Sequence, residues 1–105
     1  MWRHTPLDPL IHQPARLRIM ATLYALEPDQ EIEFTALRDL LGFTDGNLSV
    51  HLRKLEEAGY LAMSKATVER KPRTYIRLEP AGREAFEAYL SALQTLLPLS
   101  PSSKE

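Results

Sequence analysis

Residues 41–61 read LGFTDGNLSVHLRKLEEAGYL and contain a helix together with its start and stop signals. Thr44 is a good N-cap residue, because its hydroxyl can accept a hydrogen bond from a backbone N–H of the first helical turn. Leu48, Leu52 and Leu55 follow at the spacing i, i+4 and i+7, which places their side chains on one face of a helix. Gly59 then ends the pattern. The stretch predicts a helix over about residues 44–58 with one apolar face.

A second helix precedes this one after a very short turn. Gly42 suits the left-handed C-cap of a helix, and we expect that helix to begin at Thr35. Before it, residues 32–35 have the pattern of a short extended or capping segment. A first helix is expected over residues 14–26, after a helical start at residues 8–9 that the next proline interrupts.

Two strand-like runs and a last helix follow the central motif. The runs cover residues 60–64 and 74–78, and the polar stretch 65–73 between them, which contains Pro72, predicts a long hairpin loop. The last helix is expected over residues 80–97. The order helix, helix, helix, hairpin, long helix predicts a mainly α fold with a small β-hairpin, of the α+β class, and a winged helix-turn-helix architecture.

The chain resembles regulators of the MarR and ArsR type. The segments that carry the resemblance are HQPARLRIM at 12–20, the central stretch 41–61, and LEPAGR at 78–83. Over about residues 8–97, the resemblance implies one small winged-helix DNA-binding domain. Its recognition helix would be 44–58, its wing 65–74 and its dimerisation helix 80–97. One departure is Glu79, which stands where such proteins often have threonine and is a poor N-cap.

The residues expected to contact DNA lie on the recognition helix and the wing. On a helical wheel, the side opposite the leucines carries small and polar residues near the helix start, where base edges are closest. Hydroxyl, amide, methyl and imidazole groups there can read bases, Gly46 permits close approach, and cations a turn later suit phosphates. The predicted contact residues are Thr44, Gly46, Asn47, Ser49, Val50, His51, Arg53, Lys54, Lys65, Arg70, Lys71 and Arg73. Two arginines of the first helix, Arg16 and Arg18, are expected either to touch the DNA backbone or to pair with acids of the second helix.

The last helix carries an apolar stripe that is wide for a chain of this size. A three-helix core does not cover all of it, so we expect part of the stripe to form a homodimer interface with the start of the chain. The predicted interface residues are Leu7, Leu10, Ile11, Phe86, Tyr89, Leu90, Leu93, Leu96 and Leu97. A two-fold dimer would place its recognition helices roughly 34 Å apart on double-stranded DNA, which predicts a pseudo-palindromic site.

Composition limits the classes of function. The 105 residues contain no cysteine and have a net charge of −1, and the cations concentrate in residues 42–78, which hold seven basic and four acidic residues. The absence of cysteine excludes disulfides and thiol chemistry and fits a cytoplasmic protein. No run is apolar enough for a membrane span, and no catalytic motif, cofactor or metal site is predicted. We expect residues 1–7 to be flexible and the Ser/Pro-rich residues 98–105 to be disordered.

Three alternatives to a simple DNA-binding regulator stay open. The near-neutral charge is compatible with a winged-helix protein-interaction module that does not bind DNA. A metal-responsive repressor without cysteine would need ligands such as His4, His12, Glu84 and Glu87. A ligand-responsive repressor would need a small-molecule effector pocket, for which the candidate lining residues are Trp2, Tyr24, Phe86 and Tyr89, although aromatic residues at helical spacing more often belong to a core.

Overall fold

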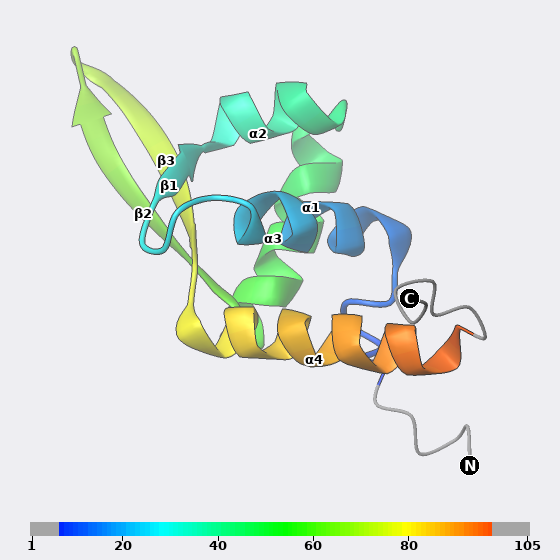
Figure 1. The fold of residues 1–105 in the computed structure, drawn as a ribbon. Helices are drawn as coiled ribbons and strands as arrows, with labels where there is room; N and C mark the ends of the chain where they lie inside the picture. The colour runs from blue at the N-terminus through cyan, green and yellow to red at the C-terminus, as the bar shows by residue number, and fades with distance from the viewer. Residues whose placement is uncertain (1–6, 98–105) are drawn as a thin grey trace.

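The computed structural model describes residues 7–97, which fold into four helices and a three-stranded antiparallel sheet (Figure 1). In chain order the elements are α1 (Pro14–Tyr24), β1 (Glu31–Glu33), α2 (Phe34–Leu41), α3 (Asp45–Glu57), β2 (Leu61–Val68), β3 (Lys71–Leu78) and α4 (Pro80–Leu96). The predicted α+β class and winged helix-turn-helix are confirmed, with α3 at the place of the predicted recognition helix and the β2–β3 hairpin at that of the predicted wing. No helix within residues 7–97 is long and apolar enough to cross a membrane. The predicted flexible N-terminus, apart from Leu7, and the predicted tail at 98–105 lie outside the described residues.

The helix starts follow local signals in the sequence. Gln13 caps α1, because its side-chain oxygen accepts a hydrogen bond at 2.9 Å from a first-turn N–H, and Pro14 occupies the first helical position. Asp8 caps only a turn, so the predicted helical start at residues 8–9 is wrong. α2 begins at Phe34, one residue earlier than predicted. It ends at Gly42, whose φ of 74° is the left-handed conformation that glycine tolerates best.

The wing is a long, regular hairpin, so the predicted loop over residues 65–73 is wrong. β2 and β3 pair along their whole length, with Val68 opposite Lys71 at the tip. Only Glu69 and Arg70 form the turn, and their φ angles of 52° and 69° are those of a type I′ turn. The turn lacks the usual Asn-Gly signal, and the outer half of the hairpin is exposed and polar. Locally, this part of the sequence therefore has the pattern of a loop.

The short segment before α2 is a true strand. In β1, Ile32 lies opposite Ile76 and Glu33 opposite Tyr75, so β3 becomes the central strand of a sheet with the order β1-β3-β2. Because β1 directly precedes α2, this pairing connects the wing to the helical part of the domain. The sequence shows only an extended or capping segment here, since the partner strand lies far along the chain.

The core lies between the helices and the inner face of the sheet. Its fully buried side chains come from all four helices, the sheet and the turn before α1. They are Ile11, Ile19, Met20, Leu23, Leu37, Leu48, Leu52, Leu55, Leu61, Ile76 and Tyr89. α4 lies on the side of the domain opposite α2 (Figure 1), and it contributes Phe86 and Tyr89 to this core. All three leucines of the predicted stripe of α3 are used in this packing, which leaves the other side of the helix to solvent.

Three parts of the fold meet at Tyr60, namely the end of α3, the start of α4 and the turn before α1. Its N–H donates to the carbonyl of Leu55 at the end of α3 (3.0 Å), and its carbonyl accepts from the N–H of Glu79 at the start of α4 (2.9 Å). Its hydroxyl donates to the carboxylate of Asp8, and this hydrogen bond raises the pKa of Tyr60 to about 12. Gly82, in the first turn of α4, approaches the same backbone so closely that a Cβ there would lie 2.0 Å from the Tyr60 oxygen. We call this set of contacts the Tyr60 junction.

Candidate nucleic-acid interface

The outer face of α3 is made of small, polar and basic side chains. It comprises the exposed residues Gly46, Asn47, Val50, Arg53 and Lys54, flanked by the half-buried Ser49 and His51. Val50 is 51% exposed although it is apolar, and it gives a polar surface one methyl-bearing side chain. Donors, acceptors and a methyl group on one exposed helix face are the groups that read base edges in a major groove.

The first turn of α3 is capped by Thr44 and carries no side chain at Gly46. The hydroxyl oxygen of Thr44 accepts a hydrogen bond from the Asn47 N–H at 3.1 Å, so the predicted N-cap is confirmed. A Cβ added at Gly46 would meet nothing within 4 Å. Packing within the chain therefore does not require a glycine at this position, and its absence of a side chain leaves room for another molecule to approach the backbone.

An arginine that the sequence analysis did not single out holds α2 and α3 together. Arg38 Nη1 lies 2.8 Å from Asp45 Oδ1, and its Nε lies 2.9 Å from Asp39 Oδ1. These two carboxylates raise the pKa of Arg38. Asp45 is the first residue of α3, where a negative charge also interacts favourably with the helix dipole. The ion pair between Arg38 and Asp45 joins α2 to α3. A helical wheel describes one helix at a time, so hydrophobic periodicity does not reveal this ion pair.

Two arginines of α1 pack against the turn and flank of the recognition helix. Arg18 Nη2 donates to the Leu41 carbonyl at 2.9 Å, and its guanidinium lies 5.2 Å from the centre of the Phe43 ring. Arg16 Nη1 lies 3.2 Å from His51 Nδ1. The pKa of His51 is lowered, first by burial of the ring and then by neighbouring cations. Within residues 7–97 neither arginine pairs with an acid of α2, so the pairing alternative is wrong, and the contact with the DNA backbone stays a prediction.

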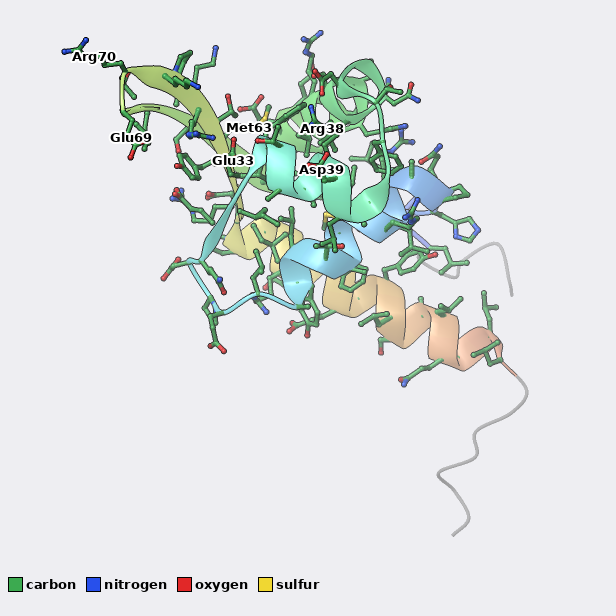
Figure 2. All side chains as sticks on the ribbon, turned by 90° about the horizontal axis from the view of Figure 1, so that it is seen from above. Glu33, Arg38, Asp39, Met63, Glu69 and Arg70 are labelled. Carbon is green, nitrogen blue, oxygen red and sulfur yellow. The ribbon has the colours of Figure 1, made fainter. Side chains whose placement is uncertain are left out.

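The wing presents exposed cations from its root to its tip. The exposed ones are Lys65, Arg70 and Lys71. Figure 2 shows Arg70 at the very end of the hairpin, pointing away from the body of the domain. Arg73 differs, because it is half-buried and its Nη1 lies 3.3 Å from Glu33 Oε2. The pKa of Glu33 is lowered by the hydrogen bond from the Thr35 hydroxyl and then by Arg73. Arg73, which was predicted to contact DNA, therefore also links β3 to β1.

A hollow of about 230 Å³ lies where α3 meets the root of the wing. Its lining side chains are Phe34, Ser49, Leu52, Arg53, Met63, Lys65 and Thr74. Three residues predicted separately as contacts, Ser49 and Arg53 on the helix and Lys65 on the wing, thus share one concave surface. The helix and the wing therefore form a single continuous face.

The predicted dimer residues separate into three groups by their exposure. Ile11, Phe86 and Tyr89 are at most 4% exposed, because they pack into the core of the chain itself and offer a second subunit almost no surface. Leu7, Leu10 and Leu93 are partly buried against that core. The residues that remain open are Leu90, Leu96 and Leu97, with exposures of 37%, 43% and 53%. The apolar surface of α4 available to a partner is thus its C-terminal half.

The residues considered for an effector or a metal have other partners. Phe86 packs against Tyr24 and Tyr89, with ring centres 5.1 and 6.3 Å apart, so these aromatic residues form a packed cluster. His12 Nδ1 lies 2.8 Å from the Tyr89 hydroxyl, and Glu87 accepts a hydrogen bond from Tyr24 at 2.9 Å. Between residues 7 and 97, no three His, Asp or Glu side chains gather as metal ligands. Of the three remaining candidates, Glu84 is exposed on α4, and Trp2 and His4 lie outside the described residues.

Comparison with known proteins agrees with this geometry. The family model of the winged helix DNA-binding domain matches residues 15–97. The chain belongs to this family. It is also 38% identical over 81 residues to the uncharacterized protein MJ0432 of Methanocaldococcus jannaschii, a match that covers 77% of this chain and 85% of that protein.

Solved structures of winged-helix regulators share the fold. The transcriptional regulator homologue from Pyrococcus horikoshii OT3 is 29% identical, with a TM-score of 0.80 over 90% of both chains. MepR of S. aureus, in a structure of its complex with DNA, is 19% identical, with a TM-score of 0.67 over 90% of this chain and 75% of that one. The family is that of winged-helix DNA-binding domains, and the fold is that of transcriptional regulators, not of enzymes.

Proposed function

We propose that this winged-helix protein acts as a dimeric, sequence-specific transcriptional regulator. The recognition helix α3 would lie in the major groove, and the wing would contact the backbone or the adjacent minor groove. The observation that carries the proposal is the outer face of α3, which exposes Asn47, Val50, Arg53 and Lys54 beside a glycine that packing does not need. A DNA complex of a protein with the same fold, MepR, supports it.

The residues divide into base-reading and phosphate-binding groups. The first two turns of α3 would read bases through Thr44, Asn47, Ser49, Val50 and His51, with Gly46 allowing close approach. Arg53, Lys54 and the wing residues Lys65, Arg70, Lys71 and Arg73 would bind phosphates. Arg73 would contribute least, because Glu33 already holds its guanidinium.

The open half of α4 supports a homodimer. Its exposed leucines, Leu90, Leu96 and Leu97, are apolar surface that a second copy can cover, and the partly buried Leu7, Leu10 and Leu93 would complete the interface. Two-fold pairing would then present two recognition helices to a pseudo-palindromic site, with half-sites roughly 34 Å apart. We test this with Leu96→Gln, which should shift sedimentation velocity from dimer toward monomer. Leu40→Gln is the matched control, since Leu40 is 65% exposed on α2 and should leave the dimer unchanged.

DNA binding is tested by selecting bound sequences from a random pool and titrating the selected duplex by fluorescence anisotropy. We expect affinity to fall steeply as salt rises from about 50 mM to about 200 mM, because phosphate contacts release counterions. Lys71→Gln should weaken binding to all sequences and reduce the salt slope by about 1. Arg83→Gln removes the same charge from α4, where the guanidinium lies against Tyr24, and should change little. Absence of binding at about 50 mM salt would refute the proposal and favour a protein-interaction module.

A further inference from the structure

His51 occupies the flank of the recognition helix that faces α1. It follows Asn47 by one helical turn, so its ring lies beside the outer face proposed to enter the groove. The ring is half-buried, with its centre 6.4 Å from that of Phe43 and its Nδ1 3.2 Å from Arg16 Nη1. One of the two ring nitrogens thus has a fixed partner inside the protein.

The chemistry of that partner determines the state of the ring. A guanidinium has only N–H donors, so the hydrogen bond requires His51 Nδ1 to be the acceptor. A neutral imidazole that accepts at Nδ1 carries its hydrogen on Nε2. A charged ring would instead point a second N–H at a cation. The contact with Arg16 therefore selects one tautomer, which has a single free donor and no free acceptor.

Arg16 is itself fixed in place. Its Nε donates to the carbonyl of Leu10 at 2.6 Å, and its backbone N–H donates to the side chain of Gln13 at 2.9 Å. The guanidinium is thus fixed by the turn before α1 on one side while it holds the His51 ring on the other. Arg18, two residues along the same helix, contacts the Leu41 carbonyl and does not touch His51.

We propose that His51 determines base specificity as an obligate donor, with Arg16 as the positioning residue that fixes its tautomer. Its Nε2–H would select a base that offers an acceptor in the major groove, such as guanine or thymine, over one that offers only a donor at that edge, such as the cytosine amino group. This inference rests on the proposed placement of α3 in the major groove. One such hydrogen bond corresponds to a discrimination of a few-fold to about tenfold.

The tautomer is measured first, without DNA. In nitrogen-15 NMR spectra of the imidazole rings at neutral pH, wild-type His51 should show a protonated Nε2 and an unprotonated Nδ1. Arg16→Met should give a mixture of tautomers, and Arg16→Lys, which keeps a donor-only cation, should retain the wild-type pattern at least in part. A wild-type ring protonated at Nδ1 would overturn this inference and leave the proposed function standing.

The base preference is then measured by random-pool selection on four proteins. Wild type should prefer one acceptor base at a symmetric pair of positions, and His51→Ala should lose that preference. Arg16→Met should relax it by a few-fold to about tenfold, while the control Arg18→Met, which removes the same charge from the same helix, should keep it. Equal base preferences in all four proteins would overturn the inference. A wild-type protein that binds no DNA would overturn the base-reading role together with the proposed function, whatever the tautomer.

Discussion

Gly46 and Gly82 lie in the first turns of α3 and α4, and the same substitution to alanine should have opposite effects at the two positions. Alanine favours a helix over glycine by up to about 1 kcal/mol. At Gly46 a Cβ meets nothing within 4 Å, so Gly46→Ala should raise the free energy of unfolding by about 0.5–1 kcal/mol. At Gly82 the same atom would lie 2.0 Å from the oxygen and 2.8 Å from the carbon of the Tyr60 carbonyl.

The contact at Gly82 cannot be relieved by turning a side chain. Its two closest atoms belong to the backbone, and real Cβ atoms essentially never come within 3.0 Å of another heavy atom. The start of α4 would have to retreat, which would stretch the hydrogen bond from Glu79 to Tyr60. Overpacking costs about 1–3 kcal/mol and a lost hydrogen bond about 1 kcal/mol. We therefore expect Gly82→Ala to lower the free energy of unfolding by about 2–4 kcal/mol.

Urea unfolding followed by circular dichroism measures both variants against wild type. The midpoint should rise for Gly46→Ala and fall for Gly82→Ala, and a loss of 1 kcal/mol should lower the melting temperature by about 4–8 °C. A DNA-binding titration gives a second test for Gly46→Ala. This variant should bind DNA more weakly than wild type although it is more stable, because the added methyl group stands where DNA is proposed to approach the backbone. A Gly82→Ala protein as stable as wild type would refute the reasoning from close approach.

Three other perturbations test single contacts. Thr44→Val removes the capping oxygen of α3 and should cost about 1 kcal/mol in a thermal melt, whereas unchanged stability would mean that the cap contributes nothing. Arg70→Gly removes the steric cost of a left-handed backbone at the tip of the wing, so it should raise the free energy of unfolding by about 1 kcal/mol while weakening DNA binding. A loss of stability would contradict the type I′ turn. Because the hydrogen bond to Asp8 raises the pKa of Tyr60 from 10.0 to about 12, its hydroxyl ionises in the unfolded chain before it does in the folded protein. The stability from this contact is therefore full below pH 10 and is lost between pH 10 and pH 12, and urea unfolding across that range should show a shallower decline for Tyr60→Phe.

The parts of the fold that local signals specify were predictable. A capping threonine and leucines at helical spacing predict α3, and Gly42 marks the end of α2, because each signal acts within a few residues. The wing and β1 were not predictable to the same degree. β1 forms because Ile32 pairs with Ile76, which lies far outside any local sequence window. A type I′ turn made by Glu69 and Arg70 also gives no glycine signal.

The candidate site shows the same division between local and distant information. The helical wheel identifies the outer face of α3, since it depends only on spacing along one helix. The wheel says nothing of Arg16, which reaches His51 from 35 positions away. The apolar stripe of α4 likewise does not reveal which molecule covers it, and Phe86 was assigned to a partner although it belongs to the core of its own chain.

The Tyr60 junction has a consequence for the half-site spacing that the proposed dimer would recognise. Because the end of α3 and the start of α4 share contacts with one residue, the recognition helix cannot swing relative to α4 without breaking them. Each protomer of the proposed dimer then moves as one rigid body. The position at which the two α4 helices pack against each other therefore determines the distance between the two recognition helices, and with it the half-site spacing. Leucine-to-methionine substitutions at Leu90 or Leu96, which keep the apolar contact of the proposed dimer but change its packing, should therefore change the preferred number of base pairs between half-sites and leave the half-site sequence unchanged.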